Sequence, residues 1–132
     1  MAAIIHHVGV TASIVDSAVR LHRDVGPGMF ESTYEMLLAD ELERRGHTVA
    51  RQVVLPLTYR SRRIDQAFRI DLLIDRAVVV EVKACERHSA MFRRQLLTYL
   101  RFTRLEVGLV LNFGLSTMKE GIDRVINTHT VP

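Results

Sequence analysis

The sequence predicts an α/β protein, a three-layer sandwich in which helices flank a mixed central sheet. Three observations predict it. Two segments with apolar residues at helical spacing come first, three consecutive segments of β-forming residues follow, and one more helical segment precedes a buried strand. The order helix, helix, strand, strand, strand, helix, strand describes an antiparallel meander followed by one helical crossover.

The elements follow from local signals, which are clearest for the first two helices. Segment 13–24 opens on Ser13-Ile-Val-Asp16, which resembles a capping box, and stops at a Gly-Pro-Gly sequence. Segment 30–45 places its apolar side chains, beginning with Tyr34 and Leu38, on one stripe and stops at a glycine. We expect a third helix at 88–104 and strands at 48–59, 68–74, 77–83, 107–112 and, at the sheet edge, 121–127.

Composition favours a single soluble domain over residues 1–132, because a chain of 132 residues suits one core. No apolar run approaches the about 18 residues that a membrane span needs, so we expect no membrane partner. The start of the chain lacks the basic-then-apolar pattern of a signal peptide, and Cys85 is the single cysteine. We therefore expect a cytoplasmic protein without a disulfide or a cysteine-built zinc site.

Two acidic residues occupy neighbouring strands where apolar residues would be usual. In segment 68–74 the even-numbered residues should share one apolar face, with Asp71 on the other. If the loop to the next strand is the three residues 75–77, Asp71 lies directly across from Glu81, and Lys83 shares that face. We therefore expect the two carboxylates to lie roughly 5 Å apart at their Cβ atoms.

A divalent cation would relieve the repulsion between these carboxylates. Mg²⁺, with Mn²⁺ as a substitute, takes one or two carboxylates and keeps several waters. The alternative is a solvated strand face on which Lys83 pairs with the acids. Lys83 is also one of only two lysines among the 18 basic residues, the other being Lys119. That scarcity is either chance or a need for a compact ammonium.

Glu31 extends the apolar stripe of segment 30–45, three residues before Tyr34. A carboxylate on that stripe should point inward and need a partner. The alternative is a capping role in the first turn, where negative charge suits the helix dipole.

Positive charge is concentrated in one segment. Residues 83–104 hold six basic residues and one acid, a local charge of +5, whereas the other 110 residues sum to −2. Such a surface would neutralise nucleic-acid phosphates, unless it is an ordinary solvated helix face. We expect one third of the helix circumference to carry Arg87, Arg93, Arg94, Arg101 and Arg104, beside a narrow stripe of His88, Gln95 and Tyr99. A second cluster, which is either a solubilising turn or a phosphate contact, consists of Arg60, Arg62 and Arg63.

The segment Gly28-Met-Phe-Glu31-Ser-Thr-Tyr34 resembles the signature of the GxxExxY protein family. That family is similar to the PD-(D/E)XK nuclease superfamily, with its restriction-endonuclease-like fold. The resemblance extends along nearly the whole chain through Arg69-Ile-Asp71, Val80-Glu81-Val-Lys83, Gln95-Leu-Leu-Thr-Tyr99 and Gly108-Leu-Val-Leu-Asn112-Phe-Gly. The sequence departs from the superfamily pattern at Ile70, where a proline is typical.

The resemblance implies a role for each matching residue. Asp71 and Glu81 would be metal ligands, with the backbone carbonyl of Val82 as a further oxygen. Lys83 would position the attacking water and stabilise developing charge. Glu31 would complete the metal shell directly or through water, and Gln95 would help organise the site.

These observations predict a Mg²⁺-dependent nuclease that hydrolyses phosphodiester bonds, with DNA favoured over RNA as the partner. The catalytic residues would be Glu31, Asp71, Glu81, Lys83 and Gln95, and the nucleic acid would contact the five arginines and Tyr99. A homodimer is the default arrangement for a small nuclease acting on duplex. The alternative is a non-catalytic module that keeps the fold and binds nucleic acid or protein.

Overall fold

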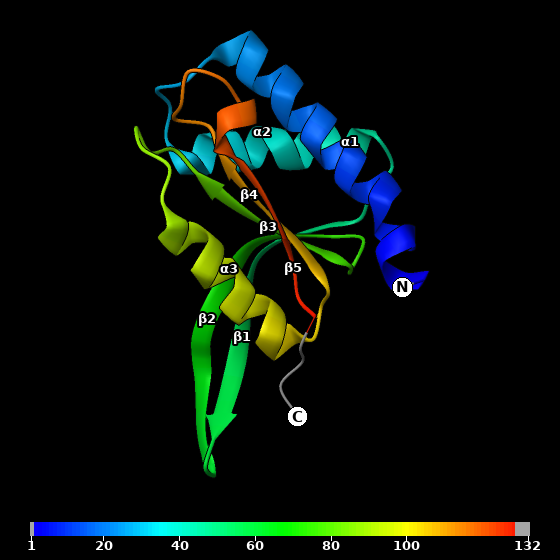
Figure 1. Cartoon of the computed structure of the whole chain (residues 1–132), viewed down its shortest axis with the longest axis vertical. Coiled ribbons are helices and arrows are strands. Elements are labelled where there is room, and N and C mark those ends of the chain that lie inside the picture. The colour runs from blue at the N-terminus through cyan, green and yellow to red at the C-terminus, as the bar shows by residue number, and fades with distance from the viewer. Residues whose placement is uncertain (1, 129–132) are drawn as a thin grey trace.

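The computed structural model describes residues 2–128 and confirms the predicted three-layer α/β sandwich (Figure 1). The strand order in the sheet is β1-β2-β3-β4-β5, and strands β3 and β4 are parallel. The other neighbours are antiparallel. The elements are α1 (Ala2–Val25), α2 (Glu31–Arg44), β1 (Val49–Tyr59), β2 (Arg62–Ile74), β3 (Val78–Lys83), α3 (Ala90–Thr103), β4 (Val107–Asn112), a short 3₁₀ turn (Lys119–Gly121) and β5 (Ile122–Ile126).

Each face of the sheet has its own apolar core. On one face, helices α1 and α2 pack on β3 and β4 through fully buried side chains such as Ile14, Tyr34 and Leu109. On the other face, α3 packs Leu96 and Leu100 against the sheet. The crossover from β3 to β4 runs through α3, as expected for a connection between parallel strands.

The first helix is longer than predicted, and the proposed capping box is wrong. Helix α1 begins at Ala2, so Ser13 lies in its interior. The Ser13 hydroxyl instead hydrogen-bonds His47 Nε2 at 2.8 Å, and Asp16 forms an ion pair with Arg45 at 2.8 Å. Both side chains tie α1 to the segment after α2, so the capping pattern reflects tertiary contacts. Among the described residues, no helix is long and apolar enough to cross a membrane.

The expectation of one continuous apolar face on β2 is also wrong. Leu72 packs in the core under α1 and α2, whereas Ile70 packs in the core under α3. The change occurs where Asp71 lies beside Gln52 of β1, at a gap in the ladder between the pairs Arg51–Leu72 and Val53–Ile70. Gln52 has a left-handed backbone, with φ at 52°. This kink changes which residues face which core, and simple alternation along a strand does not reveal it.

Strands β1 and β2 form a longer hairpin than predicted. The sequence places a loop after Tyr59 and a strand only from Phe68, but β2 begins at Arg62. The six residues before Phe68 are mostly polar or charged, so they lack the alternation that marks a half-buried strand. Two residues, Arg60 and Ser61, close the hairpin with left-handed φ values of 47° and 68°. Figure 1 shows this hairpin extending from the body of the protein.

Candidate active site

The candidate site lies where β2 and β3 separate. Their ladder pairs Leu72 with Val80 and Ile74 with Val78, which confirms the three-residue loop. Continuing this register brings Asp71 to Glu81, and their carboxylates accept hydrogen bonds that strand pairing would otherwise use. Asp71 Oδ2 accepts from the Val82 amide at 2.9 Å, and Glu81 Oε1 accepts from the Asp71 amide at 3.3 Å. The two carboxylates are thus held together at the point of divergence.

Glu81 is the strongly perturbed group of this site. Its side chain belongs to a residue only 4% exposed. Burial, and then the charge of neighbouring Asp71, raises the pKa of Glu81 to about 9, although Lys83 acts in the opposite direction. Without a cation, Glu81 therefore keeps its proton at neutral pH. A buried acid beside a second carboxylate is an arrangement typical of functional sites.

Lys83 and two residues of α3 complete this group. The Lys83 ammonium donates to Gln95 Oε1 at 3.2 Å and lies 5.1 Å from the ring centre of Phe92. Burial, and then the charges of Glu81 and Asp71, raises the pKa of the Tyr99 hydroxyl, which Gln95 also contacts. The structure therefore brings together Asp71, Glu81, Lys83, Gln95 and Tyr99.

Glu31 does not point inward, contrary to the sequence-based expectation. It is the first residue of α2 and is exposed, because the helix begins there beyond the edge of the core. The buried acid is Glu35, one turn later and 4% exposed. Its spacing to Leu38, Ala39 and Leu42 is three, four and seven residues, a signal in the sequence that could have identified it.

Glu35 connects α2 to the carboxylate pair. Glu35 forms an ion pair with Arg51 of β1 at 2.9 Å, and its Oε1 accepts a hydrogen bond from the side-chain amide of Gln52 at 2.6 Å. Gln52 Nε2 also reaches Asp71 Oδ1 at 3.4 Å. Gln52 thus stands between two carboxylates, and the kink at this residue directs its side chain there. Sequence reasoning missed both Glu35 and Gln52.

Asp71 and Glu81 fit a hard divalent cation. Mg²⁺ is commonly bound by one or two carboxylates and keeps several of its waters. A cation between Asp71 and Glu81 would also offset the repulsion between their charges. Burial, and then the charge of Asp71, raises the pKa of Glu81 and so disfavours its ionised form, and a bound cation would favour that form again. Among the side chains that the structure describes, those of residues 7–128, no group of three or more His, Cys, Asp or Glu gathers around a common point. The carbonyl of Val82 remains a predicted third ligand.

Helix α3 carries fewer of the five arginines than the sequence predicts. The helix spans Ala90–Thr103, so Arg87 precedes it and Arg104 follows in a left-handed conformation, with φ at 63°. Ser89 caps the N-terminus of the helix, and its hydroxyl oxygen accepts a hydrogen bond from the backbone amide of Met91 at 3.1 Å. All five arginines are exposed, and those on the helix itself are Arg93, Arg94 and Arg101.

Asn112 stabilises the backbone that follows Lys83 at the end of β3. This residue is fully buried, and its Oδ1 accepts from the amides of Cys85 at 2.9 Å and Gly114 at 3.0 Å. Its amide nitrogen lies 3.4 Å from His88 Nδ1, and His88 Nε2 lies 2.6 Å from Asp123. The network holds the segment that connects Lys83 at the end of β3 to the start of α3.

Replacing Asn112 by Ala is expected to destabilise the fold by about 2–4 kcal/mol, because two half-buried backbone amides lose their acceptor and a fully buried side chain is removed. Urea unfolding followed by circular dichroism measures this change. Asn127→Ala is an unsuitable control because Asn127 is also buried, so the exposed Thr128→Ala serves instead. A loss below about 1 kcal/mol would contradict the assigned role of Asn112.

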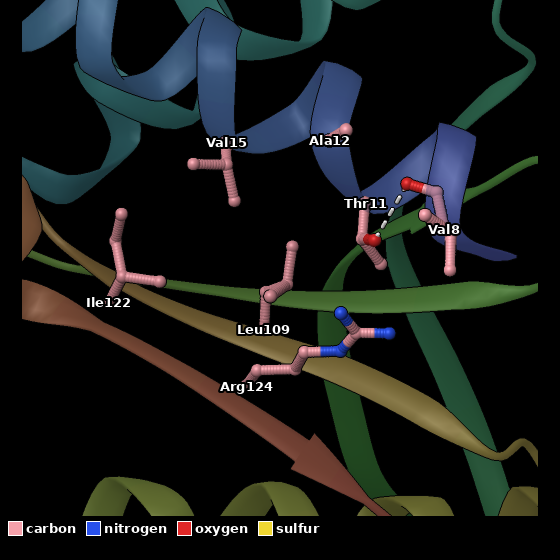
Figure 2. A pocket seen from close by; sticks show the side chains of 7 residues that line it. All are labelled: Val8, Thr11, Ala12, Val15, Leu109, Ile122 and Arg124. Atoms are coloured by element: carbon pink, nitrogen blue, oxygen red, sulfur yellow. Dashed lines mark hydrogen bonds between the residues drawn. The ribbon is translucent and has the colours of Figure 1, made fainter. Parts of the chain in front are cut away.

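The cavity in Figure 2 is separate from these residues. It has a volume of about 310 Å³ and lies between α1 and strands β4 and β5. Its lining is largely apolar, apart from Thr11 and Arg124, and includes none of the candidate site residues. The wall residue Leu109 belongs to the core under α1 and α2.

A family model described as the PD-(D/E)XK nuclease superfamily matches residues 9–125. The chain therefore belongs to this superfamily. The match does not test the narrower resemblance to the GxxExxY family, which stays a prediction. Comparisons with curated proteins and with solved structures gave no match.

Proposed function

We propose that this protein is a Mg²⁺-dependent nuclease that hydrolyses phosphodiester bonds. The observation that carries the proposal is the meeting of Asp71, buried Glu81 and Lys83 where β2 and β3 diverge. Membership of the superfamily supports the same reaction class. The group combines two carboxylates, one of them buried, with an ammonium. A metal-assisted phosphoryl reaction uses carboxylates to hold the cation and a positive group to stabilise the developing charge.

Each residue would have a distinct task. Asp71 and Glu81 would hold the cation, and the Val82 carbonyl would be a further ligand. When bound, Mg²⁺ would polarise the phosphate and lower the pKa of an attacking water. Glu81 would release its proton as the cation binds. Lys83 would place its ammonium against the charge that develops on the phosphate, and Gln95 would orient that ammonium through the 3.2 Å hydrogen bond.

Calorimetric titration with Mg²⁺ or Mn²⁺ tests the first step, with the Asp71→Asn variant as the comparison. We expect the unaltered chain to bind metal and the variant to bind at least about tenfold more weakly, since it loses one charged ligand. The matched control is Asp24→Asn, because Asp24 is an exposed acid on α1. Equal metal affinity for all three proteins would contradict the assigned site.

Cleavage assays with duplex DNA, single-stranded DNA and RNA test the reaction itself. We expect hydrolysis that requires metal, with duplex DNA as the preferred substrate, and loss of hydrolysis in Asp71→Asn but not in Asp24→Asn. Metal and DNA binding without cleavage of any substrate would overturn the nuclease proposal and favour the non-catalytic module. Absence of both activities would leave a protein-interaction role.

A further inference from the structure

Most of the outer part of the β1–β2 hairpin lies outside the cores, and only its base packs against the core under α3, through Leu55 and Phe68. We define the hairpin arm as residues 54–69, which include the pairs Val54–Arg69, Leu57–Ile64 and Tyr59–Arg62. None of these residues is buried. In Figure 1 the arm runs downward, past α3, while β3 runs toward the opposite end of the molecule. Two-stranded ribbons without a core are marginally stable in water, so packing within the fold does not explain the part of the arm beyond Leu55 and Phe68.

The base of the arm is the candidate site. Strand β2 leads from the tip of the arm directly into Asp71, and Phe68 at the base stacks on Tyr99 with ring centres 4.8 Å apart. Arg62 precedes Asp71 by nine residues, which corresponds to about 30 Å along a strand. That length equals about nine base pairs of B-form duplex. A duplex whose phosphate occupied the site could therefore run beside the arm.

The arm is strongly positive. It carries four arginines and one acid, a net charge of +3, which equals the formal charge of the whole chain. Together with the +5 of residues 83–104, this leaves −5 for the remaining 94 residues. The net positive charge is thus concentrated in two segments, and both adjoin the carboxylate pair. At the tip, Arg60 lies over the ring of exposed Tyr59, 5.3 Å from its centre.

The turn at the tip breaks a local rule of folding. Both of its residues, Arg60 and Ser61, adopt left-handed backbone conformations that Asn and Gly occupy at lower cost. No contact with either core explains an arginine at this position, because the turn is fully exposed. Such local inconsistencies are typical of functional positions. Here the outcome is a guanidinium at the outermost point of the arm.

We propose that the hairpin arm is a DNA-binding element that contacts duplex phosphates about nine base pairs from the cleavage site. This inference rests on the proposed function for its partner. The charge of the arm is complementary to a phosphate backbone. A two-stranded ribbon also fits the major groove of B-form DNA, whereas the major groove of A-form RNA is too narrow to admit side chains.

A triple variant tests the arm: Arg60→Gln, Arg62→Gln and Arg63→Gln. The matched control removes three exposed arginines elsewhere: Arg23→Gln, Arg44→Gln and Arg76→Gln. Arg44 has an exposed ion pair with Asp40, as Arg63 has with Asp65, and Arg76 shares the left-handed backbone of Arg60. Circular dichroism and thermal unfolding establish that both variants are folded.

Binding is measured by fluorescence anisotropy with a labelled DNA duplex of about 24 base pairs in Ca²⁺, which keeps the metal charge without supporting hydrolysis. We expect the arm variant to bind at least about tenfold more weakly than the control, with the slope of log affinity against log salt reduced by about 2 to 3. A duplex of about 8 base pairs that is cut at its centre extends only about four base pairs toward the tip, so its cleavage should be equal in both variants.

Each outcome is decisive. Three results would overturn the arm proposal: equal weakening of DNA binding in both variants, equal weakening of double-stranded RNA binding and DNA binding in the arm variant, or a loss of short-duplex cleavage in the arm variant but not in the control. DNA binding that depends on the arm but is not accompanied by cleavage would support the arm and overturn the nuclease. If the unaltered chain does not bind DNA at all, the arm proposal fails, and short single-stranded substrates then decide the nuclease separately.

Discussion

Replacing Glu81 by Gln is expected to abolish metal-dependent cleavage and, in the same variant, to stabilise the metal-free protein at neutral pH. The burial of Glu81 and the charge of Asp71 raise its folded-state pKa to about 9, from 4.5 in the absence of these effects. The folded state therefore binds more protons than the unfolded state between these two values. Stability linked to Glu81 is complete below about pH 4.5 and declines as pH rises toward 9.

A glutamine has the shape of the neutral acid and cannot ionise. We therefore expect Glu81→Gln to exceed the unaltered protein in stability by on the order of 2 kcal/mol at pH 7, with a larger difference at pH 8 and none at pH 4. Thermal unfolding in EDTA across this range measures the difference. Glu120→Gln, at an exposed acid, should show no such trend. A variant less stable than the parent at pH 8 would contradict the assignment of a buried, protonated Glu81.

Replacing Lys83 by Met is expected to lower kcat by about 10²- to 10³-fold while metal binding is retained. The reason is that the ammonium beside Glu81 and Gln95 would face the charge developing on phosphate, and its loss removes a transition-state contact. Steady-state cleavage kinetics and calorimetry measure the two quantities separately. Because Lys83 is partly exposed, the variant should remain folded.

The chain offers a direct control for Lys83, because Lys119 is its one other lysine. Lys119→Met, at an exposed position, should leave kcat unchanged. Lys83→Arg keeps the charge but replaces a compact ammonium with a planar guanidinium, and we expect it to lose at least about tenfold in kcat. Full activity in Lys83→Arg would show that only charge matters at this position. Full activity in Lys83→Met would remove Lys83 from the proposed mechanism.

Much of the fold and the central part of the site could be predicted from the sequence. The three-residue loop follows from matching the apolar residues nearest the turn, and the ladder confirms it from Ile74 to Leu72. Lys83 and Gln95 come together because the first ends β3 and the second lies on the crossover helix, whose period is visible in the sequence. Both relations join residues that are close in the sequence, and local sequence patterns predict such contacts well.

The errors arose where tertiary contacts override a local pattern. Glu31 fits the stripe of Tyr34 but lies at a helix terminus with no core beneath it, whereas Glu35 is buried because Arg51 and Gln52 approach it from another element. Ser13 fits a capping pattern, but its hydroxyl forms a hydrogen bond with His47 instead. Strand pairing across the long hairpin stabilises the polar residues after Tyr59, and no local periodicity reports that.

The kink at Gln52 has a mechanical consequence. Because β1 and β2 change faces there, the inner part of β2 belongs to the core under α1 and α2, and the next part belongs to the core under α3. Asp71 stands at the seam between these two packing units. A ligand bound at Asp71 would therefore contact the junction of the two packing units, and its binding free energy would stabilise the folded state of both.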